Sequence, residues 1–290
     1  MTPDDRFLYH YTTFAGLKGI LETRSLWATD FRYVNDAKEF RHAVDVALSR
    51  IQEAKKRVDT YEGGALDKLA YMLDEGETPN VYVFSLTEKK DDLSQWRGYS
   101  MGSGVAVQFE AAGLETAAAR SSFQMLPCIY EYDEQVALMD EFIEKSLAVM
   151  RRIHEPRPTD PATMLRLGAY SEISPAFSQL AVRFKDRAFR DEAEWRLVWQ
   201  APESHPQTGL KVRVAQSLLV PYFDLPIGGA LSPPDPSYGN RAVYKTPIFR
   251  CIVGPNQNPY LAKEGIRAAF ASNSVYLYAV ENSPIPLRNL

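Results

Sequence analysis

Short apolar segments with alternating side chains limit the fold of this chain more than any other feature. Three of them lie at 81–86, 104–109 and 125–132, and each has the composition of a β-strand. We expect turns between them, and not the crossover helices that join parallel strands. Regular alternation of strand and helix is missing, and the pattern therefore predicts an α+β protein.

Other segments add further strands and helices to this expectation. The segment 6–12 is expected to be a strand, with Phe7, Tyr9 and Tyr11 on one face and Leu8, His10 and Thr12 on the other. Further elements are expected as a helix begun by Thr12 or Thr13, a strand at 25–29, a helix from a capping box of Asp36 and Glu39 to about 57, strands at 193–200, 209–215 and 247–255, a helix at 260–272 and a strand at 275–281. A Pro/Gly-rich excursion is expected at 221–239.

A helical insertion is expected at about 133–184, within a single α+β domain of residues 1–290. Apolar residues of this segment fall on one helical stripe, which the stretch H-E-P-R-P-T-D-P at 154–161 interrupts. Ser174 and Pro175 are expected to restart the helix as its N-cap and first helical residue. No internal repeat or break in composition marks a second domain.

Composition and charge exclude several classes of protein. With 45% hydrophobic and 24% charged residues, the chain is expected to be globular rather than disordered. A net charge of -4 argues against a broad basic surface for nucleic acid, although a local basic cleft is invisible in that sum. We find no secretory signal and no apolar run long enough to cross a membrane, and Cys128 and Cys251 fit buried thiols, so a cytoplasmic protein is expected.

Metal and phosphate signatures are missing from the sequence. The four histidines, His10, His42, His154 and His205, lack the spacing of metal ligands, so no metal is expected. Glycine-rich phosphate loops and the nucleophile elbow of hydrolases are missing too. Function must therefore be argued from polar residues on the expected strands.

Polar side chains interrupt three otherwise apolar strands. They are His10 with Thr12, Ser85, and Glu194 with Arg196. Burying such groups costs free energy unless they are paired, so their recurrence in strands of one sheet indicates a shared cleft. Each residue taken alone fits a structural role better than a functional one, and only the combination favours a site.

The stretch D-D-L-S-Q-W-R-G-Y-S at 91–100 is unusual for the loop that we expect there. Loops favour Gly, Pro, Asn and Asp, whereas this one carries Trp96, Arg97 and Tyr99. Beside such a cleft, the aromatic rings would give a flat stacking surface for a ring of the ligand and the guanidinium would bind an anionic group. Alternatively, Trp96 fills the core while Arg97 pairs with Asp91, Asp92 or Glu194.

Four motifs, L-Y-H-Y-T, L-S-Q-W-R-G-Y, E-W-R-L-V and I-V-G-P, resemble a bacterial family of unknown function over nearly the whole chain. The first motif, followed by G-L-K-G-I-L, also resembles the opening of the ADP-ribosyltransferase superfamily, in its His-Tyr-Glu subclass. That resemblance implies a split, mostly antiparallel sheet with flanking helices. It also implies that NAD is the substrate.

The same resemblance implies roles for particular residues. His10 would hold a ribose hydroxyl of NAD with support from Thr12, and Glu194 would accept a hydrogen bond from the 2′-hydroxyl of the nicotinamide ribose. Its carboxylate would stabilise the positive charge that develops as nicotinamide departs. The residues expected to bind NAD are His10, Tyr11, Thr12, Ser85, Trp96, Arg97, Tyr99 and Arg196. Two assignments stay open: the stacking ring is Phe84, Tyr99 or Tyr11, and Glu192 competes with Glu194.

The leading hypothesis is thus an NAD-dependent ADP-ribosyltransferase, acting as a toxin or phage-defence effector. Its acceptor would be a protein side chain, a nucleic-acid base or water. Basic residues within 183–196 would guide a phosphate-bearing acceptor, or they form a solvated helix face. Two other hypotheses are a nucleotide-binding sensor without catalysis, and a hydrolase that uses His10 with Glu192 or Glu194 as acid and base.

Overall fold

The structure is a computed structural model that describes residues 6–34, 37–75, 80–100, 103–153, 170–201, 208–215, 218–229, 231–234, 240 and 242–286. His154, His205, the stretch 154–161 and Asp36 of the expected capping box lie outside the described residues.

The described elements are a mixture of strands and helices without regular alternation along the chain. The strands are β1 Phe7–Thr12, β2 Ser25–Asp30, β3 Val81–Thr87, β4 Val105–Glu110, β5 Gln124–Pro127, β6 Glu194–Gln200, β7 Lys211–Ala215, β8 Leu218–Pro226, β9 Ile248–Val253 and β10 Ala279–Asn282. The α-helices are α1 Phe14–Thr23, α2 Ala37–Lys55, α3 Thr60–Glu75, α4 Leu93–Tyr99, α5 Ala111–Arg120, α6 Tyr132–Ile153, α8 Tyr170–Ala181 and α9 Pro259–Ser272. Two 3-10 helices, η2 Phe31–Tyr33 and η4 Arg187–Glu192, join them.

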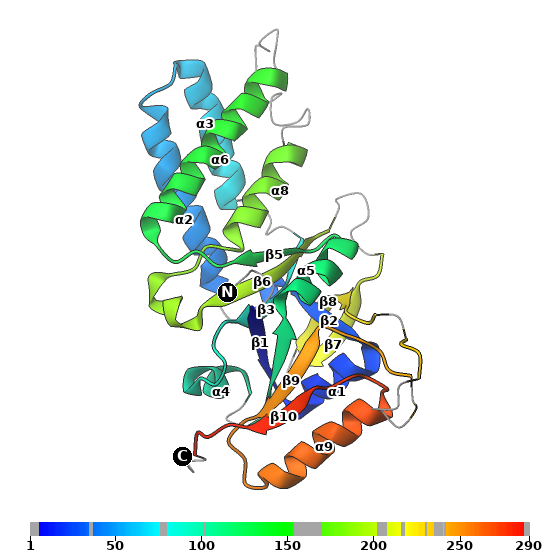
Figure 1. Ribbon diagram of the computed structural model, residues 1–290. Helices are drawn as coiled ribbons and strands as arrows, with labels where there is room; N and C mark the ends of the chain where they lie inside the picture. Colours follow the sequence, from blue (N-terminus) through cyan, green and yellow to red (C-terminus); the bar gives the residue numbers. More distant parts are fainter. Residues whose placement is uncertain are drawn as a thin grey trace.

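The strands form one mixed, mostly antiparallel sheet, which confirms the α+β class (Figure 1). Their order is β10-β9-β4-β1-β3-β2-β8-β7, and β6 pairs with both β3 and β5. Among these pairs, β9 and β10 run parallel and the others antiparallel. Strand β3 therefore has β6 along one edge, while β1 and β2 share its other edge.

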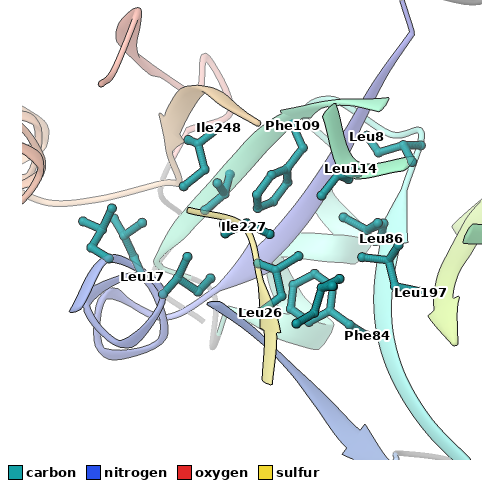
Figure 2. Packing of buried hydrophobic residues seen from close by; sticks show 14 of the residues in the cluster. Leu8, Leu17, Leu26, Phe84, Leu86, Phe109, Leu114, Leu197, Ile227 and Ile248 are labelled. Carbon is teal, nitrogen blue, oxygen red and sulfur yellow. The ribbon is translucent and has the colours of Figure 1, made fainter. Parts of the chain in front are cut away.

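The main hydrophobic core covers one face of this sheet. It contains Leu8, Leu26, Phe84, Leu86 and Leu197, which alternate with side chains of the opposite face (Figure 2). Helices α1, α5 and α9 cover this face with Leu17, Ile20, Leu21, Leu114, Ile266 and Phe270. The alternation expected for 6–12 holds, because Leu8 enters this core while Tyr9 and Tyr11 pack with Trp96 on the other face.

Helices α2, α3, α6 and α8 form a separate layer beside the sheet (Figure 1). They enclose a second core that includes Leu66, Leu69, Met139, Ile143 and Phe177. Two of these helices come from the expected insertion, whereas α2 and α3 come from the connection between β2 and β3. The layer is thus assembled from two segments that lie far apart in the sequence.

Four expectations about helices were wrong. Helix α3 was not predicted at all, α4 replaces the expected loop at 91–100, and α5 replaces the expected turn between β4 and β5. Asp92 caps α4 by accepting hydrogen bonds from the amides of Ser94 and Gln95, which turns an acidic loop sequence into a helix start. Helix α8 begins at Tyr170, so Pro175 lies inside it and not at its first position.

The expected Pro/Gly-rich excursion was also wrong in part. Residues Leu218–Pro226 form β8, which pairs with β7 on one side and β2 on the other. Pro221 obscured this strand, since proline lacks the N–H that a central strand normally uses. None of the helices in the described ranges combines the length and the apolar character that crossing a membrane requires.

Candidate functional site

A cleft lies where β1 and β3 part from each other. Its lining comes from β1, β3, α4 and the connection from η4 to β6, and comprises Tyr9, His10, Tyr11, Ser85, Leu86, Thr87, Gln95, Tyr99, Glu192 and Glu194. We call this set the candidate cleft. Strands β1 and β3 share the single register pair Tyr9 and Thr87. Further along β3, the same edge is taken by β2 through Val83 and Thr29.

His10 fills the opening between these two contacts. Its Nδ1 lies 2.9 Å from the carbonyl oxygen of Ser85, the residue midway between Val83 and Thr87 on β3. A carbonyl oxygen only accepts, so Nδ1 carries the proton and Nε2 is left as an acceptor. By strand register His10 belongs to the face opposite Glu194, and the parting of the strands lets both border one cleft.

The electrostatic surroundings keep the His10 ring neutral. Burial lowers its pKa to about 4, against the effect of the Ser85 hydrogen bond and with a contribution from the charge of Arg213. The ring also lies 4.2 Å from the ring of Phe84, measured between centroids. A neutral imidazole at physiological pH suits a hydrogen-bond acceptor better than an acid, because it has no second proton to donate.

The lowered pKa of His10 predicts a loss of stability in acid. The unfolded chain binds a proton at this ring below about pH 6.5 and the folded chain only near pH 4, so the contribution is present above 6.5 and is lost between these values. For this partly exposed ring the loss is at most about 3 kcal/mol. We expect the His10 imidazole to titrate near pH 4 in NMR spectra, assigned through its disappearance in His10→Gln. A midpoint at pH 6 or above would contradict the assigned burial.

Glu194 belongs to a buried ionic cluster at the first residue of β6. Its Oε1 accepts from Arg196 Nε at 2.8 Å, and its Oε2 accepts from Arg196 Nη2 at 3.0 Å and from Lys185 Nζ at 2.7 Å. Burial opposes ionisation of this carboxyl, yet the charges of Arg196 and Lys185 outweigh it and lower the pKa of Glu194 to about 2. The carboxylate is therefore ionised throughout the physiological range.

Glu39 of α2 completes the cluster from the helical layer. Its carboxylate accepts from Arg196 Nη2 at 2.6 Å and lies 3.2 Å from Lys185 Nζ. Arg196 also donates to the carbonyl of Val182 at 2.6 Å, so each nitrogen of its guanidinium donates a hydrogen bond to a protein partner. Arg196 is thus buried and held by opposite charges within the protein. This geometry does not favour the expected contact of Arg196 with NAD.

Glu192 and Tyr99 stand at the outer side of the same cluster. Lys185 Nζ donates to Glu192 at 2.5 Å, and the Tyr99 hydroxyl donates to the other carboxylate oxygen at 3.2 Å. Ala193, between the two glutamates, has a positive φ of 43° and turns the chain sharply. Glu192 therefore lies in η4. Its position two residues before Glu194 had suggested a shared strand face, and that expectation was wrong, although both carboxylates contact Lys185.

Helix α4 carries Trp96 in a structural role, which was one of the two alternatives for this residue. Trp96 is fully buried, its indole Nε1 donates to Asp91 at 2.7 Å, and its ring meets Tyr11 edge-on with centroids 4.6 Å apart. Tyr11 in turn donates to the carbonyl of Lys89 at 2.8 Å. Trp96 therefore anchors α4 to β1, while Tyr99, about one helical turn further along α4 and more exposed, borders the cleft.

The structure brings only part of the expected site together. His10, Tyr11, Ser85, Tyr99 and Glu194 border the candidate cleft, whereas Thr12, Trp96, Arg97 and Arg196 do not. The Thr12 side chain packs against helix α1 where only the hydrogen of Gly16 fits. Arg97 is exposed and has no ion pair within the described ranges, so the expected pairing with Asp91, Asp92 or Glu194 is wrong.

Sequence reasoning missed Gln95, Lys185 and Glu39. Gln95 lies within the L-S-Q-W-R-G-Y motif, and Lys185 lies within the basic run at 183–196, so both carried a weak signal. Glu39 carried none, because it was interpreted as a helix cap. In the described part of the chain, His, Cys, Asp and Glu side chains do not gather in a group that could hold a metal ion.

A sequence family matches one part of the chain that carries this site. Residues 95–197 match a family described as a protein of unknown function (DUF2971). The match begins in α4 and ends in β6, which confirms the resemblance to a family of unknown function for this part of the chain. No curated protein and no solved structure matches the chain.

The chemistry available in the cleft follows from these residues. It offers a neutral imidazole acceptor at His10, two ionised or ion-paired carboxylates at Glu192 and Glu194, and the exposed aromatic ring of Tyr99. Such a set favours a ligand with hydroxyl groups, a flat ring and a centre that becomes positively charged.

Proposed function

We propose that the candidate cleft binds NAD and that the protein transfers ADP-ribose from it to a macromolecular acceptor. The observation that carries this proposal is the convergence of His10, Tyr99 and Glu194 at the parting of β1 and β3. A sheet that opens between two strands, with a histidine on one and a carboxylate beside the other, agrees with the resemblance to ADP-ribosyltransferases.

In the proposed reaction, the bond between the ribose C1′ and the nicotinamide nitrogen breaks. Nicotinamide leaves with the electron pair, the acceptor nucleophile forms a bond with C1′, and the acceptor's proton passes to solvent. The Glu194 carboxylate stabilises the positive charge that develops on the ribose. Its Oε1 accepts one hydrogen bond from Arg196, so this oxygen retains a lone pair for a ribose hydroxyl.

The other cleft residues have matching roles in this proposal. His10 Nε2 accepts from a ribose hydroxyl, because its Nδ1 is committed to Ser85. Tyr99 provides the stacking surface for nicotinamide, since the Tyr11 hydroxyl is engaged by the backbone and its ring by Trp96. A toxin or phage-defence role and a nucleic-acid or protein acceptor belong to the proposal as well, and labelled products would identify the acceptor.

Release of nicotinamide from NAD tests this function directly. We expect release by the purified protein with cell extract as the source of acceptors, and a loss of about 10²- to 10³-fold in Glu194→Gln. Glu192→Gln and His10→Ala, measured beside it, show which groups share the role. Chromatographic quantification of nicotinamide is the measurement.

Two controls make the result interpretable. Asp191→Asn removes an exposed carboxylate next to Glu192, outside the cleft, and is expected to retain full release. Because Glu194 is part of a buried cluster, unfolding of each variant is measured under the assay conditions. Wild-type protein that leaves NAD intact in the presence of extract would refute the transferase proposal.

One observation favours a second candidate, a nucleotide sensor without catalysis. Glu194 is held by three charged hydrogen bonds from Lys185 and Arg196, as a carboxylate with a structural role would be. In a sensor, Glu194→Gln would keep nucleotide binding, and nicotinamide would never be released. Hydrolysis with His10 as the acid is less favoured, because its lowered pKa leaves it unprotonated at neutral pH.

A further inference from the structure

Arg213 on β7 is a half-buried arginine without a carboxylate partner among the described residues. Its Nη2 donates to the hydroxyl of Thr29 at 3.1 Å, whereas its buried Nε has no hydrogen-bond partner. Burial lowers the pKa of this guanidinium, with a smaller opposing effect of Tyr222. A charged group that is partly desolvated and incompletely bonded is costly for the fold, and an anionic ligand would remove that cost.

Strand register places Arg213 on the cleft side of the sheet. Arg213 pairs with Val220, Tyr222 pairs with Thr29, and Thr29 pairs with Val83, and paired residues share a face. Val83 lies on the same face of β3 as Ser85 and Thr87, the residues that border the candidate cleft. In Figure 1, β7, β8 and β2 lie side by side next to β3.

The groups beside Arg213 on this face are an ion pair and an indole. Lys211 pairs with Oδ2 of Asp224, while the buried Oδ1 of the same carboxylate has no hydrogen-bond partner. Trp27 lies on β2 beside Tyr222, with ring centroids 5.2 Å apart, and its buried indole Nε1 also lacks a partner. The patch therefore presents two unused N–H donors and one uncompensated positive charge.

We propose that Arg213 and Thr29 form an anion subsite that takes a phosphate group of the ligand bound in the candidate cleft. The identity of that ligand as a nucleotide rests on the proposed function. Thr29 pairs with Val83, which lies four residues or about 13 Å along β3 from the cleft residue Thr87, and this offset lies within the length of an extended dinucleotide. The charge of Arg213 already reaches His10, whose pKa it helps to lower after burial.

This assignment replaces the one made from sequence. Arg97 was expected to bind the anionic part of the ligand and Arg196 to contact NAD, but Arg196 donates to Glu39, Glu194 and Val182, and Arg97 does not border the cleft. A guanidinium is suited to phosphate because its planar donors match two oxygens at once.

Calorimetric titration of the full chain tests the subsite with three probes. These are ADP-ribose and inorganic pyrophosphate, which carry phosphate, and adenosine, which does not. Arg213→Gln is expected to weaken ADP-ribose and pyrophosphate at least about tenfold while adenosine is unaffected, since a charged hydrogen bond is lost. Arg213→Lys should restore part of the affinity as a point charge, and Arg120→Gln, on the exposed end of α5, is the matched control.

Each outcome supports or overturns the subsite. Equal affinities in wild type and Arg213→Gln, or no binding of ADP-ribose and pyrophosphate by wild type, would overturn it, as would a tenfold loss in Arg97→Gln alone. The transferase proposal fails separately. If ADP-ribose binding depends on Arg213 but no nicotinamide is released, the subsite is supported and the transferase proposal is refuted. If Arg213→Gln releases nicotinamide at the wild-type rate and with the wild-type KM for NAD, the transferase proposal is supported and the subsite is refuted.

Discussion

Replacing Arg196 with methionine is expected to lower the free energy of unfolding by about 3–5 kcal/mol. The guanidinium contacts Glu39 and Glu194 and is nearly inaccessible to solvent, with an exposed fraction of 2%. Its removal leaves Lys185 as the remaining cation of the cluster against three carboxylates, and it leaves the Val182 carbonyl without its donor. Methionine fills much of the space, so most of the loss is electrostatic.

Urea denaturation followed by circular dichroism measures this loss. Arg50→Met is the matched control, because Arg50 pairs with Asp140 across a more exposed contact between α2 and α6. That variant is expected to lose at most about 1 kcal/mol. Equal losses in the two variants would show that the buried cluster contributes no more than a surface ion pair.

Replacing Trp96 with alanine is expected to cost about 3–5 kcal/mol as well, but for a different reason. The indole is fully buried between Tyr11 and Gly254, so its removal leaves a cavity that the backbone around it cannot fill. Asp91 also loses the indole N–H, and its side chain keeps the hydroxyl of Ser283 as its donor among the described residues. Thermal and urea unfolding measure the change.

Trp96→Phe separates the two parts of this effect. It keeps most of the ring volume and loses the hydrogen bond to Asp91, so an intermediate cost is expected. If Trp96 instead stacked on a base, as the sequence also allowed, Trp96→Ala would weaken nucleotide binding with little loss of stability. That result would contradict the anchoring role assigned to Trp96.

The local pattern of the sequence was sufficient for much of the sheet. Alternation in 6–12 and 194–200 correctly put Leu8 on the face opposite Tyr9 and Tyr11, and Glu194 on one face with Arg196. Period-two patterns report faces because neighbouring side chains in a strand point to opposite sides. The existence of polar residues on buried strands likewise indicated where a cleft would lie.

Other features depend on distant pairing, which local patterns do not report. Glu39 meets Arg196 across 157 positions of sequence, and nothing in the helix 37–55 distinguishes that glutamate from a surface residue. The parting of β1 and β3 follows from which strands pair, so it could not be derived from either strand alone. Helix α4 is too short for a periodic pattern, and its cap was interpreted as loop chemistry.

The divided origin of the helical layer has a consequence for how the chain is made. During translation α2 and α3 emerge roughly 100 residues before α8, an interval of about 5–20 s at ordinary rates of synthesis. The apolar residues around Leu66 and Leu69 have no partner from α6 until about the last third of that interval, and none from α8 until its end. The nascent chain is therefore expected to depend on chaperones that bind exposed apolar helices until the second pair arrives.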